Sequence, residues 1–416
     1  MSGYALREGP AVGIHDDLYA RALYLRGSEE EFAIVVADVL GVDSDLYYEI
    51  ADRVEQELGI SPGKLVILGT HTHSGPALQS YWTDIEIPTL REVFAMDVVE
   101  ALKAATRKLT EVKVADGIGE VRDIVVNRRS PKRGSIDPRV HIIAFYRDSF
   151  LEAILSNYTC HAVVLGANNR LISADYPGAL NRTVETLTGA FSIFLNGTCG
   201  DINPLTPRTV LDRIYDRSVG TFDDVEWMGK ILACEVVKIA LSKRGIVSDA
   251  DLLHSCIETT LKVRCPYSLN EARDMVVRAQ EKVKKTKTSS REEYYKALLD
   301  LYYARVILHK TLKYCKKGEI TIYVHGLALT REVAIVFLPS EVLVEIGLKI
   351  KENSPFPNTI VASYTNDYFG YIAPSSEYPK GGYEVEYPVN ILEKGEGDKL
   401  IELSLKVLRT LFETFD

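Results

Sequence analysis

Short apolar runs of strand length, each ending in glycine, polar or turn residues, recur along the chain and limit the fold more than any other feature. In the first 210 residues these runs alternate with segments of helical periodicity. The predicted strands cover residues 32–38, 65–69, 140–145, 151–158 and 191–195, and the predicted helices cover residues 45–58, 88–109 and 178–187. The alternation predicts a mixed α/β fold.

The second half of the chain continues this pattern around one distinct segment. Strands are predicted over residues 320–329, 333–338 and 359–364, and helices over residues 342–351 and 398–414. Residues 268–316 are highly charged and nearly free of glycine and proline, with a break at residues 284–290, so they predict a hairpin of two long helices. We expect one large domain over residues 1–416, with mixed and antiparallel sheets flanked by helices and the hairpin as an insertion.

Composition limits the class of binding partner and the cellular compartment that we expect for this protein. The formal net charge is −9, which argues against a nucleic-acid partner because phosphate binding needs a basic face. The start, MSGYALREGP, lacks the charged and apolar regions of a signal peptide, and no apolar run reaches the ~18–20 residues that span a bilayer. These features predict a cytoplasmic protein without a transmembrane segment.

The six cysteines are scattered and form no C-x-x-C pair; they are Cys160, Cys199, Cys234, Cys256, Cys265 and Cys315. In a cytoplasmic chain this spacing predicts buried or free thiols and no disulfide framework. Cys160 and Cys199 stand beside candidate site residues, where we expect them to have a structural role.

The segment THTHSGP follows the predicted strand at 65–69 and places His71 and His73 two residues apart. In extended backbone, side chains at this spacing project to the same side. Two imidazoles at the end of a core strand suit a metal site or an acid–base pair. The alternative is that one histidine hydrogen-bonds to the strand end while the other faces solvent.

Two further strand ends carry polar residues that could join this site. His161 follows the predicted strand at 151–158, and Asp201 lies in the turn-rich segment NGTCGDINP after residues 191–195. Asp201 could orient His161 or another ligand, or it could simply form a turn before the proline.

Glu341 follows the predicted strand at 333–338, in the sequence LPSE. A carboxylate would complete the set of two histidines and one acid that is typical of zinc sites. The structural alternative is that Ser340 caps the following helix and Glu341 lies in its first turn, where the helix dipole favours an anion. The segment NDYFGYI after the strand at 359–364 adds Tyr368 and Tyr371, and Tyr383 lies further on.

These five segments, in this order, resemble the neutral (non-lysosomal) ceramidase family, through THTHSGP above all and through GIHDDLYARAL at residues 13–23 and ADVLG at residues 37–41. The resemblance covers most of the length of that family's catalytic domain. It implies one Zn²⁺ ion held by His71, His161, Glu341 and Tyr371. It also implies that His73 and Tyr383 lie near the substrate carbonyl.

The resemblance further implies a substrate-contacting arginine in the segment NRRSP, which offers Arg128 or Arg129. The sequence departs from the family at GDINP, where Asn203 takes the place of a serine that the family treats as essential. A serine-dependent step is therefore excluded, and zinc-activated water is the expected nucleophile.

The expected function is zinc-dependent hydrolysis of a carboxylic amide, with a small-molecule or lipid-like amide as the substrate. Two alternatives stay open on the sequence alone. One is a zinc-dependent lactonase or esterase, because the same site would serve both bonds. The other is a non-catalytic zinc- or ligand-binding protein that lost activity with the change to Asn203.

Overall fold

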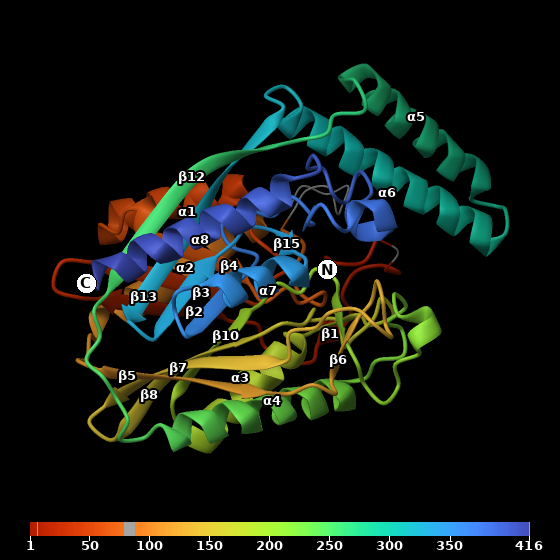
Figure 1. The fold of residues 1–416 in the computed structure, drawn as a ribbon. Helices are drawn as coiled ribbons and strands as arrows, with labels where there is room; N and C mark the ends of the chain where they lie inside the picture. Colours follow the sequence, from red (N-terminus) through yellow and green to blue (C-terminus); the bar gives the residue numbers. More distant parts are fainter. Residues whose placement is uncertain (6, 79–87, 416) are drawn as a thin grey trace.

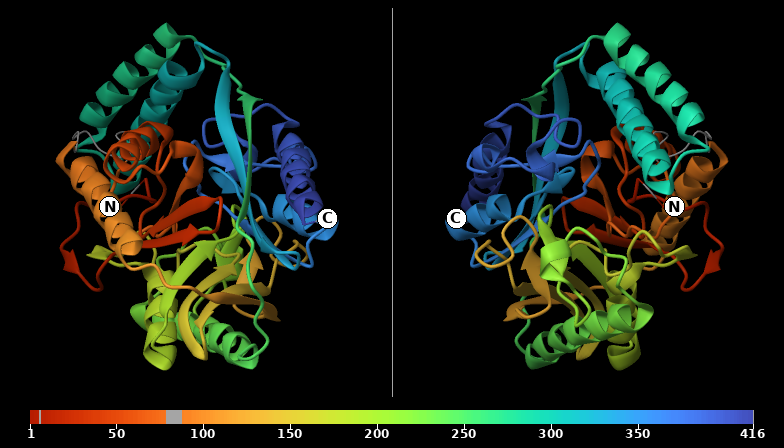
Figure 2. Two further views of the ribbon diagram at one scale, coloured as in Figure 1. Left: turned by 90° about the vertical axis from the view of Figure 1, so that its left-hand side faces the viewer. Right: turned by 90° about the vertical axis from the view of Figure 1, so that its right-hand side faces the viewer.

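Three β-sheets face one another around a shared core, and each sheet is covered on its outer side by a pair of helices (Figures 1 and 2). The computed structural model describes residues 1–5, 7–78 and 88–415. The mixed α/β architecture predicted from the sequence is confirmed, and most predicted strands and helices lie within three residues of their observed bounds.

The first sheet has the strand order β2-β3-β4, with β2 (Ala20–Arg26), β3 (Glu31–Ala37) and β4 (Leu65–Gly69). β2 is antiparallel to β3, and β3 is parallel to β4. Helices α1 (Ser44–Leu58) and α2 (Pro88–Arg107) pack on its outer face. β3 is apolar on both faces, since Val35 faces the helices and Ile34 faces the shared core.

The second sheet has the order β10-β8-β7-β5, with β5 (Lys113–Glu120), β7 (Arg139–Arg147), β8 (Phe150–Tyr158) and β10 (Phe191–Asn196). Helices α3 (Asp175–Thr188) and α4 (Phe222–Ser242) cover it. The third sheet has the order β12-β13-β14-β16, with β12 (Leu253–Lys262), β13 (Glu319–Thr330), β14 (Val333–Phe337) and β16 (Asn358–Ala362). Its helices are α7 (Val344–Asn353) and α8 (Glu396–Thr414).

Three two-stranded ladders connect the loops between these units. They are β1 (Gly13–Ile14) with β9 (Leu171–Ile172), β6 (Val125–Asn127) with β11 (Ile202–Pro204), and β15 (Glu341–Val342) with β17 (Tyr371–Ile372). The third ladder contains two of the candidate ligands. None of the described helices combines the length and apolar character needed to cross a membrane.

The predicted helical hairpin is present as α5 (Leu269–Thr286) and α6 (Arg291–Tyr314), which project from the three-sheet body (Figure 1). Ser268 and Glu271 form a capping box at the start of α5, and Ser290 caps α6. The expectation that no cysteines pair is wrong at the base of this hairpin. Cys265 and Cys315 form a disulfide. The two helices of the hairpin bring Cys315 back beside Cys265, which lies 50 residues earlier.

Candidate functional site

The candidate ligands lie just beyond the carboxyl ends of parallel strands. His71 follows β4, His161 follows β8 and Glu341 follows β14. Each of these strands has a parallel neighbour, in the pairs β3–β4, β8–β10 and β14–β16. Because the three sheets share one core, their carboxyl ends open toward the same place, which is where open α/β sheets place ligand sites.

The structure brings these three side chains together. The Nε2 atoms of His161 and His71 lie 3.1 Å and 3.4 Å from Oε2 of Glu341. His73 joins them, with its Nε2 atom 3.2 Å from Nε2 of His71. One ring nitrogen from each of the three histidines lies within 4.8 Å of the others, so the imidazoles form one compact group.

Backbone carbonyls fix the orientation of two of these rings. Nδ1 of His71 lies 2.8 Å from the carbonyl oxygen of Leu40, and Nδ1 of His161 lies 2.5 Å from that of Cys199. A carbonyl oxygen only accepts hydrogen bonds, so each Nδ1 carries the proton and donates it. In the neutral tautomer this leaves the Nε2 lone pairs of both rings directed at the Glu341 carboxylate.

Burial lowers the pKa of two of these histidines, and the neighbouring histidines lower that of Glu341. His71, His161 and Glu341 are buried. Burial, followed by the charge of Arg128, lowers the pKa of His161 to about 4. Burial also lowers the pKa of His73, helped by the neighbouring His71 and His161. For Glu341, burial opposes ionisation, but the adjacent histidines outweigh it and hold the pKa well below the usual value.

Unusual backbone conformations gather around this group. His71, Ser340, Tyr364 and Asn366 have positive φ angles of 65°, 61°, 64° and 59°, which non-glycine residues rarely adopt. Backbone hydrogen bonds interlock these loops: the amide of Tyr364 donates to Ser340 and that of Asn366 donates to Ile67. Strain of this kind persists only where the surroundings over-determine it, and it concentrates at functional sites.

Tyr371 lies beside Glu341 in the ladder of β15 and β17. The two residues are register partners in a parallel pair, so their side chains share a face. Both line a cavity of about 60 Å³, together with His73 and Tyr383. Two of the four ligand candidates that the resemblance implies, Glu341 and Tyr371, therefore line one small cavity.

Tyr368 is a neighbour of the carboxylate that sequence reasoning did not select. Its hydroxyl donates a short hydrogen bond to Oε1 of Glu341. The segment NDYFGYI contains both Tyr368 and Tyr371, and only the spatial pairing distinguishes their roles.

Of the two arginines in NRRSP, Arg128 faces the site. Its guanidinium donates to the Tyr371 hydroxyl over 2.8 Å and to Oε1 of Glu384 over 2.7 Å. Arg129 instead holds the following loop through Glu377, Glu384 and the carbonyl of Gly381. Of the two arginines, Arg128 is therefore the one that hydrogen-bonds to a candidate ligand.

Asn203 is engaged at both ends of its amide. Its Oδ1 accepts from Arg128 over 3.3 Å, and its Nδ2 donates to the carbonyl of Ile214 over 2.9 Å. The side chain is buried and carries no nucleophilic atom. It therefore serves here as a packing and hydrogen-bonding partner of Arg128.

Asp201 does not orient His161, contrary to one sequence-based expectation. Its Oδ1 accepts from the amide of Val344 over 2.8 Å, and its Oδ2 accepts from Asn127 over 2.8 Å. Burial raises the pKa of Asp201 to about 6. Asp201 thus accepts a hydrogen bond from the first amide of α7. The group that orients His161 is the carbonyl of Cys199.

Ser340 does not cap the helix that follows Glu341. Its Oγ accepts from the amide of Phe369, and α7 begins only at Val344, after Leu343 as its N-cap. Glu341 is therefore held in β15 and not in a first helical turn. The structural alternative considered for this segment is wrong.

Cys160 and Cys199 are buried thiols, as expected. The sulfur of Cys199 lies 3.0 Å from the Tyr364 hydroxyl, and that of Cys160 bonds to the backbone carbonyl of His161. Burial raises the pKa of both thiols. Both sulfurs are thus occupied in hydrogen bonds of the surrounding framework.

Lys310, on α6, is a buried site neighbour that no sequence pattern indicated. Its ammonium donates to the carbonyls of Phe369 over 2.9 Å and Pro388 over 2.7 Å. These carbonyls flank the segment that carries Tyr371 and Tyr383. Lys310 also lines the small cavity, together with Tyr302, Tyr303 and Val306 of the same helix.

The N-terminal segment closes another side of the site. Gly3 has a φ of +93°, and a Cβ atom there would lie 2.4 Å from the ring of His73. Tyr4 packs edge-on against the same ring, with centroids 4.9 Å apart. Only glycine fits this position without displacing His73.

Comparisons with known proteins agree with the fold described above. Residues 1–204 match the family described as neutral/alkaline non-lysosomal ceramidase, N-terminal. The solved neutral ceramidase from Pseudomonas aeruginosa superposes with a TM-score of 0.76 at 16% identity, covering 100% of this chain and 72% of that one. A structure described as a ceramidase complexed with C2 gives a TM-score of 0.74 at 15% identity, covering 100% of this chain and 73% of the other.

The structural likeness establishes the fold, and the family match covers the part of the chain that contains His71, His73 and His161. The resemblance inferred from THTHSGP is thereby confirmed. Residues 1–204 thus match the N-terminal model of the neutral/alkaline non-lysosomal ceramidase family, and the whole chain shares the fold of solved neutral ceramidases.

Proposed function

We propose that this protein is a zinc-dependent amide hydrolase that cleaves N-acyl amides of the ceramide type. The family match over residues 1–204 supports hydrolysis of an amide bond. The observation that carries the metal dependence is the convergence of two Nε2 lone pairs, from His71 and His161, on the carboxylate of Glu341.

The donor set fits a divalent cation. Two neutral imidazoles and one carboxylate are the ligands of many catalytic zinc sites. Each imidazole here donates the N–H of its other ring nitrogen, Nδ1, to a backbone carbonyl, as metal-bound histidines usually do. The hydroxyl oxygen of Tyr371, on the partner strand of Glu341, would add a fourth ligand. When bound, zinc supplies Lewis-acid polarisation of the carbonyl and a lowered pKa of bound water.

His73 is suited to proton transfer beside this ligand group. Its ring is closely packed by Gly3 and Tyr4, and its Nδ1 atom is buried without a hydrogen-bond partner among the described residues. A neutral imidazole can donate at one nitrogen and accept at the other. His73 would therefore accept a proton from the attacking water and pass it to the nitrogen of the amine that leaves.

Tyr383 and Arg128 would organise the carbonyl side of the site. Tyr383 lines the same cavity as His73 and Glu341, and its hydroxyl is a potential donor to the oxygen that gains negative charge. Arg128 does not line this cavity. It fixes Tyr371 through a hydrogen bond and stabilises Glu384, the residue next to Tyr383.

The test is hydrolysis of matched substrates by chelated and zinc-reconstituted enzyme. A panel with the same acyl group in an amide, an ester and a lactone should show cleavage of the amide that is lost on chelation and restored by zinc. Glu341→Ala should abolish cleavage of the amide. Glu345→Ala, which removes a nearby glutamate in the first turn of α7, should leave cleavage intact. Full activity after chelation, or cleavage of the ester and lactone without the amide, would refute the proposal.

A further inference from the structure

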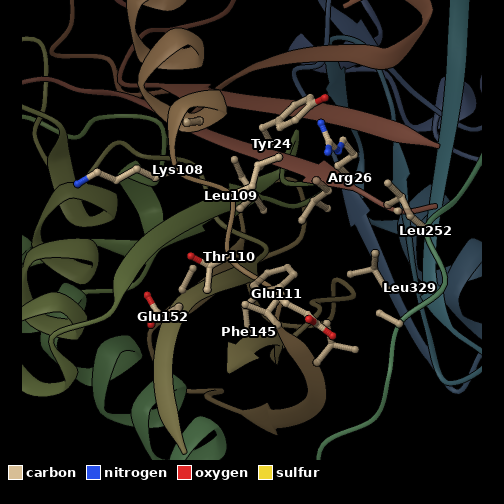
Figure 3. A pocket seen from close by; sticks show the side chains of 18 of the residues that line it. Tyr24, Arg26, Lys108, Leu109, Thr110, Glu111, Phe145, Glu152, Leu252 and Leu329 are labelled. Atoms are coloured by element: carbon tan, nitrogen blue, oxygen red, sulfur yellow. The ribbon is translucent and has the colours of Figure 1, made fainter. Parts of the chain in front are cut away.

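A second, larger cavity lies at the opposite end of the three-sheet core from the candidate site. It has a volume of about 760 Å³. Its lining includes residues 22–28 at the end of β2 and beyond it, residues 105 and 108–112 at the end of α2 and beyond it, and residues 249, 250 and 252 before β12 (Figure 3). We call it the distal pocket. A volume of this size falls within the ~300–1,000 Å³ range of pockets that hold small molecules.

Strand register places the distal pocket far from the ligand group. Arg26, in its wall, is the backbone register partner of Glu31 at the amino end of β3. Ala37 ends β3 on the side of His71. β3 has seven residues, so the two ends are roughly 20 Å apart. The distal pocket is therefore separate from the candidate active site.

The floor of the distal pocket is the open end of the shared core. Val114, Phe145 and Leu329, one from each of β5, β7 and β13, are buried members of that core and line the cavity. Leu23 and Leu25 of β2 are only partly buried and form its wall. Contact with an alkyl chain would remove the apolar surface of this floor from water, so an alkyl chain suits it.

The charges at the mouth leave an excess of unpaired positive groups. Of the lining acids, Glu152 is paired with Arg147 and Asp249 with Lys113. Two lining bases, Arg26 and Lys108, form no ion pair with any residue that the structure describes, and the third lining acid, Glu111, likewise has none. Two unpaired cations against one unpaired anion favour a ligand with a single negative charge.

Arg26 is the better placed of the two cations. Figure 3 shows its guanidinium beside Tyr24, near Leu252, while Lys108 extends away at the opposite edge. The apolar residues Phe145 and Leu329 lie on the other side of the cavity from Tyr24. A head group near Arg26 would thus leave its chain free to reach the apolar floor.

We infer that the distal pocket binds a monoanionic single-chain amphiphile such as a fatty carboxylate, with the alkyl chain on the core floor and the carboxylate near Arg26. This inference does not depend on the proposed amide hydrolysis. A site of this kind would let a carboxylate amphiphile bind the protein without occupying the candidate active site.

The experiment titrates the intact protein with dansyl-undecanoic acid and follows its fluorescence. Saturable binding is expected, with displacement by hexadecanoate. Each additional methylene in a series of competing carboxylates should tighten binding by up to about fourfold until the cavity is filled. Hexadecanol, which lacks the charge, should compete more weakly than hexadecanoate.

Two variants locate the site. Ala153→Phe places a ring on the pocket lining and should remove saturable binding. Arg26→Glu should weaken binding about fivefold, whereas Lys287→Glu, the same charge change in the distant loop of the hairpin, should leave it unchanged. Because Ala153→Phe could impair folding, Arg26→Glu and the comparison with hexadecanol provide independent tests.

Binding by the His71→Ala variant separates the two sites, because that change should leave the distal pocket intact. The inference is overturned if the probe does not bind saturably, if Arg26→Glu binds like the wild type, or if hexadecanol competes as well as hexadecanoate. Loss of binding in His71→Ala would also overturn it, since the probe would then occupy the candidate active site.

Discussion

The guanidinium of Arg128 donates a 2.8 Å hydrogen bond to the hydroxyl of Tyr371, and both side chains are buried. The same guanidinium pairs with Glu384, whose second oxygen is held by Arg129. One cation therefore links the ladder that carries Glu341 and Tyr371 to the loop that carries Tyr383. The positions of Tyr371 and Tyr383 thus depend on Arg128, which lies more than 240 residues earlier in the chain.

Replacing Arg128 with lysine should reduce turnover while leaving the protein folded. A single ammonium cannot reach Tyr371, Glu384 and Asn203 together as the planar guanidinium does. We expect kcat to fall about 10²-fold, as when a well-oriented donor is lost, with the zinc content unchanged. Arg129→Lys is the matched control and should affect thermal stability more than kcat. Rates within twofold of the wild type for Arg128→Lys would contradict this role.

Replacing Asp201 with alanine should destabilise the fold without removing the metal. Its carboxylate accepts from the first amide of α7, in the manner of a helix cap donated by another segment. Loss of such a cap costs about 1–2 kcal/mol of unfolding free energy. Urea unfolding measures this change, and metal analysis of the same sample should give the wild-type zinc content. Loss of zinc from the folded variant would mean that Asp201 acts on a ligand after all.

Lys310→Met should weaken both stability and catalysis. The ammonium satisfies the carbonyls of Phe369 and Pro388, which flank the segment carrying Tyr371 and Tyr383. We expect a loss of about 1–3 kcal/mol in unfolding free energy and at least a tenfold drop in kcat. Lys313→Met removes a more exposed ammonium, paired with Asp45, and should change stability by less than about 1 kcal/mol. Similar effects from both substitutions would argue against a specific role for Lys310.

Stability should decrease as the pH falls below about 6.5, in part through His254 and His325. Burial, followed by the charge of Lys64, lowers the pKa of His254 to about 4, and burial next to His254 lowers that of His325 to about 3. Both values lie below the ~6.5 of an unfolded chain, so the unfolded state binds more protons between these limits. Acidification through this range therefore favours unfolding, by up to about 2.7 kcal/mol per pH unit for two groups.

The measurement is urea unfolding of the wild type and of the double variant His254→Gln, His325→Gln at pH 7 and pH 5. The variant should lose less stability between the two values than the wild type. Equal losses would show that this pair titrates alike in the folded and unfolded states.

The sequence predicted those features that local patterns encode. Apolar runs located β3, β4, β8, β10 and β14, and the polar residues after them pointed to His71, His161 and Glu341. The charged segment at 268–316 predicted both hairpin helices. The zinc ligands and the roles of His73, Tyr383 and Arg128 came from the family resemblance, because the strand pattern alone left other readings of these residues open.

The remaining features depend on contacts between distant segments. Lys310 resembles the other lysines of the hairpin in sequence, and only its contact with Phe369 and Pro388 distinguishes it. Asp201 has the local context of a turn, yet its partner is the amide of Val344, 143 residues away. The disulfide between Cys265 and Cys315 likewise depends on how the helices return. No spacing rule identifies such pairs.

The zinc content of purified wild-type protein, His71→Ala and His73→Ala, measured by mass spectrometry without added metal, tests the central claim most directly. The account predicts about one zinc per chain in the wild type and in His73→Ala, and almost none in His71→Ala. Only His73→Ala should combine retained zinc with lost amide hydrolysis. A wild-type protein without metal, or equal zinc loss in both variants, would contradict the assignment of these two histidines and the metal dependence built on it.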